Sequence, residues 1–497
     1  MSIYEVVFCG DAEENANRHL LKHFRANKPQ EDLCFALWRP GTGKCRYTGI
    51  IYKIILPEKG DRKLHGNVEF SPRFLSRAIN VAIRENAGLA FMHSHPSDGW
   101  QDMSGPDIIA ERDVLSPPAL ATGLPLLGLT IGTDGYWSAR FWKRNEKEMH
   151  RHWCQKVRVV SKESYKIYCN DYLVPPPARK NILKRTFDTW GGKHQSNVAR
   201  LRVGVVGLGS VGCIIAEALA RIGIGNVVLI DPDRVEEHNL DRLLYGTMAD
   251  IDRYKVDVAS EMMKKHATAE NININALPIS VHHEQAYYEA LDCDFLFSCV
   301  DRPVARDVLN FIAFAHLIPV VDGGVAVTVN KGGEFYAHWR SHLVTPYHQC
   351  LRCNKQYSTS DVVTELDGSL DDPAYISNLP KEQRGGNQNV FPFSLSVASM
   401  EINMMIRYIT SQEWWPEVQQ QDYQFLVGSM RINNQKCNEH CTFQKERVAF
   451  GNKCKPHYIA STKIETNRSL IFLHVLRIRQ WFERQSTRFF GRESEME

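Results

Sequence analysis

Three side chains that commonly bind a metal lie close together near residue 100. His93 and His95 are separated by one residue, and Asp107 follows within the segment SGPD. In an extended strand, residues i and i+2 point to the same face, so both imidazoles would project together from the end of the strand-like run GLAFMHSHP. Ser104 and Pro106 are typical of a helix N-terminus, whose first turn would bring the Asp107 carboxylate back toward the histidines. Two imidazoles and one carboxylate form a common zinc site with one position left for water.

The chemistry expected of such a site is hydrolysis. Zinc acidifies its bound water, and a general base then accepts the proton. An isolated His-x-His pair is more often an ordinary surface pair, but the complete string H-x-H-P-x7-S-x2-D is rare by chance. It resembles the JAB/JAMM family of metalloproteases, which cut peptide or isopeptide bonds after the C-terminal glycine of ubiquitin-like proteins. The resemblance implies zinc on His93, His95 and Asp107, and it implies that Ser104 steadies the tetrahedral intermediate.

The resemblance also implies a glutamate at the start of an upstream strand. Glu31 precedes the apolar run 33–38 and is assigned as the general base. Two other glutamates compete, but Glu58 follows a strand-like run and Glu69 lies just before a helix start. The alternative interpretation of Glu31 is a solvated turn carboxylate.

The whole chain limits the classes of protein to consider. A chain of 497 residues is too long to fold around one hydrophobic core, so two or three domains are expected. A net charge of +3 argues against a dedicated nucleic-acid binder. The start of the chain does not resemble a secretory signal, and no apolar run has the length of a membrane span. Thirteen cysteines, an odd number, indicate a reducing, cytoplasmic setting with some of the thiols bound to metal.

Composition and periodicity divide the chain into four parts. Residues before 150 alternate strand-like and helix-like segments, and the proline-rich stretch 174–181 is the clearest break. The predicted fold class is α/β. The JAB/JAMM resemblance implies a JAB/MPN-type first domain, and a doubly wound, Rossmann-like domain is expected to follow it. The tail is predicted to be a docked helix, and its apolar-then-basic sequence also allows a helix on a membrane surface. The predicted boundaries are 1–150 for the first domain, 151–184 for a linker, 185–450 for the second domain and 451–497 for the tail.

A glycine motif opens the second domain. Gly207, Gly209 and Gly212 form GxGxxG between an apolar strand and a helix. This pattern places phosphates at the helix N-terminus. Asp231, at the end of the next strand, would accept hydrogen bonds from ribose hydroxyls. An NAD-dependent dehydrogenase would show the same pattern up to this point.

The residues that follow favour a triphosphate. Asn239, Arg242 and Lys255 supply two cations and an amide. Hydride transfer does not need such a set, whereas adenylyl transfer from a triphosphate does. Asp301 ends a later buried strand, with Arg306 close behind. A carboxylate at the carboxyl end of a parallel strand is well placed to hold Mg²⁺.

These motifs resemble the ThiF/MoeB/HesA and ubiquitin-activating family over roughly residues 185–440. The resemblance implies that Arg185 serves the ATP site of a neighbouring subunit, and hence a homodimer, although its flanking residues depart from the usual Arg-Gln pair. The implied roles are ribose binding by Asp231, phosphate binding by Asn239, Arg242 and Lys255, and Mg²⁺ binding by Asp301.

Two pairs of cysteines predict a structural zinc site, because four thiolates are a common zinc set. A CxxC pair is followed much later by a CxxxC pair. Unliganded buried thiols are the alternative interpretation. The expected ligands are Cys350, Cys353, Cys437 and Cys441, with Cys454 or His440 as substitutes for one member.

Ubiquitin-activating enzymes usually carry a thioester-forming cysteine in the region between these pairs. Here the chain has no cysteine between Cys353 and Cys437. The remaining cysteines lie in segments that read as buried, where thiols are unreactive. We therefore expect the product to be an acyl-adenylate, with no stable thioester on this chain. The alternative is that a cysteine elsewhere, or on a partner, takes the acyl group.

The combined prediction is a two-headed enzyme that acts on a ubiquitin-like, β-grasp protein. One head would trim or remove the modifier by zinc hydrolysis, and the other would adenylate its C-terminus with ATP and Mg²⁺. Tethering would raise the effective concentration of a shared substrate, and a conjugating enzyme is a further expected partner. The alternatives are activation and trimming of a sulfur carrier for cofactor or cysteine biosynthesis, and a non-catalytic scaffold.

Overall fold

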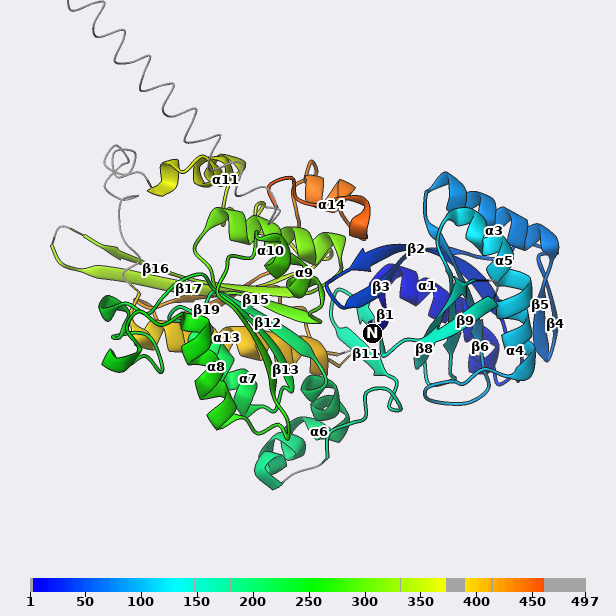
Figure 1. Cartoon of the computed structure of the whole chain (residues 1–497), viewed down its shortest axis with the longest axis horizontal. Coiled ribbons are helices and arrows are strands. Elements are labelled where there is room, and N and C mark those ends of the chain that lie inside the picture. The colour runs from blue at the N-terminus through cyan, green and yellow to red at the C-terminus, as the bar shows by residue number, and fades with distance from the viewer. Residues whose placement is uncertain are drawn as a thin grey trace, which may run out of the picture.

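The computed structural model describes residues 3–146, 148–178, 181–330, 332–371, 389–412 and 414–459. Its strands form two large mixed sheets, which occupy opposite ends of Figure 1. We call residues 3–178, blue to cyan in the figure, the first head, and the part from residue 181 the second head.

The first head is built on a nine-stranded sheet with the order β11-β10-β1-β3-β2-β6-β7-β8-β9. Strand β6 is buried at every position, as its apolar sequence predicts for a central strand. A separate hairpin, β4 (Arg62–His65) and β5 (Asn67–Phe70), stands beside the sheet. The sheet strands are β1 (Ile3–Cys9), β2 (Leu33–Thr42), β3 (Arg46–Ile55), β6 (Gly88–Ser94), β7 (Leu126–Ile131), β8 (Trp137–Asn145), β9 (Glu148–Trp153), β10 (Lys156–Val160) and β11 (Tyr165–Cys169).

The helices of the first head cover this sheet. The predicted start of α3 is confirmed, because the Ser71 side chain accepts a hydrogen bond from the Phe74 amide and Pro72 occupies the first turn. The turn at Asp134 and Gly135 joins β7 to β8 as an antiparallel pair, as expected. The helices are α1 (Gly10–Leu20), α2 (Lys22–Arg25), α3 (Pro72–Arg84), α4 (Gly105–Ile109) and α5 (Ser116–Ala119), with a π-helical segment, Ala110–Leu115, between the last two.

The first head extends beyond the boundary expected at residue 150. Strands β10 and β11 lie within the predicted linker 151–184, yet β10 pairs with β1 in parallel and with β11 in antiparallel orientation. The connection between the heads is therefore short and begins after Cys169.

The second head has an eight-stranded sheet with the order β14-β13-β12-β15-β16-β17-β18-β19. The first five strands are parallel and the last three are antiparallel. This parallel half, with helices on both faces, confirms the predicted doubly wound fold. The strands are β12 (Arg202–Val206), β13 (Asn226–Ile230), β14 (Asn273–Leu277), β15 (Phe295–Ser298), β16 (Val320–Val329), β17 (Phe335–Val344), β18 (Gln420–Gln424) and β19 (Ser429–Asn433).

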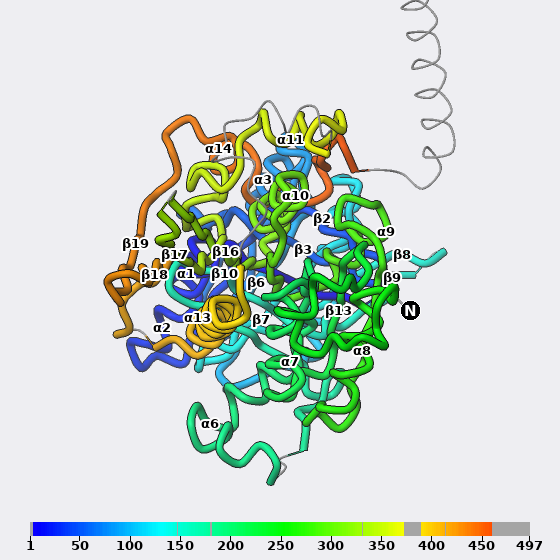
Figure 2. Tube along the Cα trace, turned by 90° about the vertical axis from the view of Figure 1, so that its left-hand side faces the viewer, coloured from blue at the N-terminus to red at the C-terminus, as the bar shows by residue number. Residues whose placement is uncertain are grey.

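Helices α7, α8 and α13 pack in one hydrophobic cluster on one side of this sheet, and α9 and α10 pack in another. Helix α6 projects from the second head in both views (Figures 1 and 2). The helices are α6 (Lys184–Ala199), α7 (Gly212–Arg221), α8 (Lys255–His266), α9 (Glu284–Leu291), α10 (Pro303–Ala315), α11 (Thr359–Leu366), α13 (Phe391–Thr410) and α14 (Thr442–Glu446).

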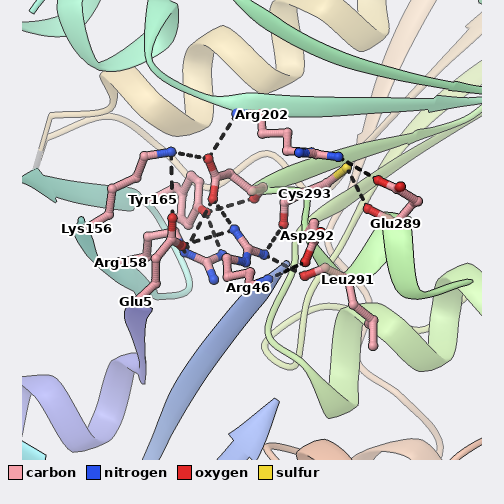
Figure 3. Close-up of polar contacts among 11 residues, drawn as sticks. Glu5, Arg46, Lys156, Arg158, Tyr165, Arg202, Glu289, Leu291, Asp292 and Cys293 are labelled. Atoms are coloured by element: carbon pink, nitrogen blue, oxygen red, sulfur yellow. Dashed lines mark hydrogen bonds and ion pairs between the residues drawn. The ribbon is translucent and has the colours of Figure 1, made fainter. Parts of the chain in front are cut away.

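A buried set of charges joins the two heads (Figure 3). The Asp294 carboxylate, just before β15, lies 2.6 Å from the Arg46 guanidinium of β3 and 2.6 Å from the Lys156 ammonium of β10. The Tyr165 hydroxyl donates to the carbonyl of Asp294 at 2.8 Å, and its ring lies 6.4 Å from that of Phe295. The heads therefore share one continuous core. The junction cluster comprises Glu5, Arg46, Lys156, Arg158, Tyr165 and Asp294.

The predicted C-terminal helix lies mostly outside the described residues, which end with a short turn, Gly451–Lys453, and the segment up to residue 459. Within the described part of the chain, no helix combines the length and the apolar character needed to cross a membrane.

We expect Asp294→Asn to lower the free energy of unfolding by about 3 kcal/mol or more, because it leaves buried cations without their counter-charge. Burial alone would raise the pKa of Asp294, but Lys156 and Arg46 hold it far below its ordinary value. The stabilisation should therefore be complete above about pH 4 and be lost as the pH falls further. Urea unfolding at several pH values measures both effects. The matched control is Asp171→Asn, which removes a 64% exposed partner of Arg200 and should cost below about 1 kcal/mol. Equal effects of the two variants would contradict the prediction.

Candidate functional site

The predicted metal ligands of the first head lie together at the end of β6 and the start of α4. The Nε2 atoms of His93 and His95 are 3.1 Å apart. Asp107 places Oδ1 3.4 Å from His93 Nε2 and Oδ2 3.2 Å from His95 Nε2. The ligand atoms of all three residues lie within 4.8 Å of one another. The strand end and the helix start thus converge as the sequence predicts.

The donor set fits a zinc ion. Two imidazole nitrogens and a carboxylate converge on one point, and His93 is buried with its ring stacked on Phe91 at 5.3 Å. Burial would raise the pKa of Asp107, but hydrogen bonds from His93 and His95 lower it far below its ordinary value, so the carboxylate is ionised. An ionised carboxylate with imidazoles suits a divalent cation that would hold and acidify a water molecule.

Ser104 fixes the carboxylate of this set. Its side chain accepts from the Asp107 amide at 3.3 Å, and Asp107 Oδ2 accepts from the Ser104 amide at 2.8 Å, which makes a capping box. The Ser104 hydroxyl also donates to Asp107 Oδ2 at 2.6 Å. The predicted helix cap is confirmed. The role of Ser104 in steadying the tetrahedral intermediate stays a prediction.

Glu31 lies near enough to the predicted metal ligands for the charges of His95 and Asp107 to act on its carboxylate. It is half-buried, and burial raises its pKa; the nearby Asp107 charge raises it further, while His95 lowers it. The competing glutamates lie elsewhere: Glu58 is exposed and pairs with arginines of α3, and Glu69 pairs with His65. A half-buried carboxylate with a raised pKa is suited to accept a proton near neutral pH.

The four predicted cysteines of the second head form one cluster. Their sulfur atoms lie within 4.8 Å of one another. The amides of Cys350 and Cys353 donate to sulfur atoms of the set, at 3.1 and 3.3 Å. The hydrogen bond with Cys437 and burial raise the pKa of Cys350, and the Cys353 amide opposes that rise. Four converging sulfur atoms are a common zinc set. Neither His440 nor Cys454 joins the cluster in the described structure.

The glycine loop connects β12 to α7 and needs glycine for two different reasons. Gly207 has φ of 89°, and a Cβ there would lie 2.4 Å from the Cys299 carbonyl oxygen. At Gly212 a Cβ would lie 1.8 Å from the carbonyl oxygen of Gly207. Gly209, by contrast, has open space around its missing side chain. The first two glycines are thus required by the turn itself, and Gly209 leaves room for a phosphate at the N-terminus of α7.

Two predicted nucleotide ligands meet beside this loop. Asp231 follows β13, is buried and accepts from the amides of Leu208 and Asp233. Burial raises its pKa, and the charge of Lys255 lowers it. Lys255 begins α8 and lies 2.9 Å from the Asp233 carboxylate. The carboxylate predicted to bind ribose and the cation predicted to bind phosphate are therefore close together.

The other residues predicted for the ATP site lie in turns or at exposed positions. Asn239 caps a short turn by accepting from the Glu236 amide at 3.2 Å, and Arg242 donates to the His238 carbonyl at 2.6 Å. Asp301 is exposed beyond the carboxyl end of β15. Arg185 is exposed near the start of the projecting helix α6. Their predicted roles remain untested by these contacts.

Sequence reasoning missed a buried ionic group beside the loop. Asp322 of β16 is fully buried and accepts from Ser298 at 2.6 Å, from Arg306 at 3.3 Å and from Arg340 at 2.6 Å. Arg306 is therefore paired rather than free. The run VVDGG could have identified Asp322 from the sequence. It places a carboxylate at the end of an apolar segment, as the run before Asp301 also does.

One expectation about cysteines is wrong. Cys45 is exposed, although it was read as buried. Its amide donates to the Asp292 carboxylate at 2.9 Å, at the amino end of β15. The glycine loop follows the carboxyl end of β12, which runs parallel to β15, so Cys45 lies at the opposite edge of the sheet.

Comparison with known proteins places the second head in a wider group. The ThiF family model matches residues 183–445. The adenylyltransferase and sulfurtransferase UBA4 of Meyerozyma guilliermondii is 31% identical over 119 residues, which cover 24% of this chain and 28% of that protein. The Escherichia coli molybdopterin-synthase adenylyltransferase is 33% identical over 146 residues, covering 29% and 56%. The sulfur carrier protein ThiS adenylyltransferase of the same organism is 29% identical over 160 residues, covering 32% and 60%. The chain thus spans from 28% to 60% of the length of these relatives.

We expect the purified protein to hold about two zinc ions, one at each of the two ligand groups. His93→Ala should remove the ion of the first head and Cys437→Ser that of the second, while each leaves the other ion bound. Elemental analysis of protein dialysed against metal-free buffer measures the content. His150→Ala, which changes a histidine of β9 outside both groups, is the control and should retain both ions. Unchanged zinc in His93→Ala would rule out the first site.

Proposed function

The chain belongs to the ThiF family, and we propose that its second head is an ATP-dependent adenylyltransferase that activates the C-terminal carboxylate of a small β-grasp protein. In this reaction a carboxylate oxygen bonds to the α-phosphorus of ATP, and pyrophosphate leaves with the electrons of the broken bond. The product is a mixed anhydride, the acyl-adenylate.

The observation that carries this proposal is the placement of Asp231 and Lys255 beside an open glycine loop. Asp231 would accept from ribose hydroxyls, and the loop amides would bind phosphate oxygens. Lys255 and Arg242 would neutralise the charge that develops on the phosphates. Asp301, exposed at the carboxyl edge of the sheet, would bind the Mg²⁺ that accompanies ATP.

The relatives favour a sulfur carrier as the substrate. One of them acts on the sulfur carrier ThiS by name, and another carries a sulfurtransferase activity in its name. A ubiquitin-like modifier, which would also require a conjugating enzyme, is the second substrate class. Of the cysteines, Cys45 alone is exposed, and it lies at the far edge of the sheet, so this head would release an acyl-adenylate rather than form a thioester. Arg185 on the projecting helix α6 would complete the site of a second subunit in a homodimer.

A second activity is favoured by the converging His93, His95 and Asp107 with Glu31 beside them. We propose that the first head is a zinc peptidase of the JAB/JAMM type that cuts after the C-terminal glycine of the same β-grasp protein. Glu31 would take the proton of the attacking water and return it to the leaving amine. The Ser104 hydroxyl would stabilise the tetrahedral intermediate.

We expect ATP–pyrophosphate exchange that depends on an added carrier, with E. coli ThiS and ubiquitin as the two probes. Asp301→Ala should lower the exchange rate about 100-fold or more by removing the metal ligand. Gly209→Ala should weaken ATP binding without changing the thermal midpoint, whereas Gly212→Ala should also lower the midpoint. Glu261→Ala, an exposed carboxylate of α8, is the control and should leave exchange unchanged. Exchange that is unaffected by Asp301→Ala would refute the assignment.

We expect the intact chain to cleave a fusion in which a short peptide follows the C-terminal glycine of ThiS or ubiquitin. Glu31→Gln should lower the cleavage rate at saturating substrate about 100-fold or more, with zinc still bound, because it removes the proposed proton acceptor. Glu58→Gln is the matched control and should cleave normally, since Glu58 pairs with α3 instead. Full cleavage by Glu31→Gln would contradict the peptidase mechanism.

A further inference from the structure

A second buried carboxylate stands directly after Glu31 in the sequence. Asp32 is fully buried, and four basic side chains from outside its own strand surround it. Arg62 Nε lies 2.7 Å from Oδ1, and Lys22 Nζ lies 2.9 Å from Oδ2. The Nε2 atoms of His19 and His23 lie 3.3 and 3.4 Å from the carboxylate. Helices α1 and α2 and the β4–β5 hairpin thus all meet at this one side chain.

The backbone of Asp32 is bonded to the strand that carries the metal ligands. Its amide donates to Ser94 Oγ at 3.0 Å, and its carbonyl accepts from the Ser94 amide at 3.1 Å. Ser94 is fully buried and lies between His93 and His95 in β6. A shift of Asp32 would therefore change the separation between Glu31 and the histidines.

Glu31 is fixed from its other side as well. Its amide donates to the Gly66 carbonyl at 3.1 Å, at the tip of the β4–β5 hairpin. The Gln30 side chain donates to the carbonyls of Gly66 and Asn67 and accepts from the Gly66 amide at 2.9 Å. The hairpin is itself held by Arg62 on Asp32.

We propose that Asp32 is a positioning residue, whose ion pairs with α1, α2 and β4 hold Glu31 at a fixed distance from His93 and His95. This inference rests on the proposed peptidase function of the first head. Asp32 does not touch the reacting atoms and acts only through Glu31.

The ionised form of Asp32 is what this role requires. Burial alone would raise the pKa of Asp32, but hydrogen bonds from His19 and Lys22 lower it to about 2, so the carboxylate is charged at neutral pH. An amide of the same shape carries no negative charge to pair with the Lys22 and Arg62 cations. In the amide variant, Lys22 and Arg62 would turn toward solvent, which both side chains can reach. The start of β2 and the β4–β5 hairpin would then lose the ion pairs that hold them.

The test is a double-mutant cycle between Glu31→Gln and Asp32→Asn in the intact, zinc-loaded chain, with the glycine-peptide fusion of ThiS or ubiquitin as the probe. Asp32→Asn should lower kcat 10- to 100-fold, with KM and zinc content unchanged. In the Glu31→Gln background, Asp32→Asn should lower the residual rate less than two-fold, because the group that it positions is gone. The matched control is Glu13→Gln, which neutralises another buried carboxylate of the first head, bonded to Trp137 and Asn17, and should leave kcat unchanged.

Several outcomes would overturn the inference. If Asp32→Asn retains full kcat while Glu31→Gln is inactive, Asp32 has no positioning role. If Asp32→Asn lowers the rate by the same factor in both backgrounds, its role is merely structural. If Asp32→Asn loses zinc, the deciding variant is Ser94→Ala. It removes the hydrogen bond between the Asp32 amide and the Ser94 hydroxyl without a change of charge. An unchanged kcat in Ser94→Ala would also overturn the inference. A wild-type chain that cleaves neither fusion refutes the proposed peptidase itself, and the inference with it.

Discussion

The ion pairs of Asp294 determine how the two heads can be arranged. A carboxylate with no exposure to water must be matched by cations at short range, and here both nearest cations, Arg46 and Lys156, come from the other head. Each of these pairs fixes a strand of one sheet against a strand of the other. The apolar contacts around Tyr165 then close the same interface. The two heads are therefore joined by a buried ionic and apolar interface as well as by the connecting chain.

This junction also determines where the two candidate sites lie. Arg46 begins β3 and Asp294 precedes β15, so the junction is at the amino ends of both strands. Strand β6 runs in the same direction as β3, because each is antiparallel to β2, and its histidines are at its carboxyl end. The glycine loop is likewise at the carboxyl end of β12, which is parallel to β15. Each candidate site is thus at the strand ends opposite those that form the junction, so the proposed carrier would have to leave one site before it reached the other.

The sequence predicted the groups whose members are close along the chain. His93, His95 and Asp107 follow from strand alternation and a helix cap, and the glycine loop follows from a local turn, so both could be recognised without tertiary information. The ion pair of Arg46 with Asp294 joins residues 248 positions apart, so no local sequence pattern predicts it.

The same ion pairs explain why part of the first sheet was missed. Strand β10 carries Lys156 and Arg158, both buried, so it lacks the apolar pattern by which buried strands are recognised. Asp32 was overlooked for a related reason, because a carboxylate next to Glu31 looks like an ordinary turn residue until its four basic neighbours are in place. In both cases the decisive partners come from distant segments.

The cysteine cluster affects how far the fold of the second head would depend on zinc. Its two pairs lie before α11 and after β19, so a bound ion would close a loop that contains α13, β18 and β19. Such a cross-link removes conformational freedom from the unfolded loop, and its loss would loosen the antiparallel half of the second sheet. Under the two proposed functions, the adenylating head would then depend on zinc as the peptidase head would, although its own chemistry uses none. A shortage of zinc would suppress both proposed activities together, and the supply of activated carrier would follow the supply of this one metal.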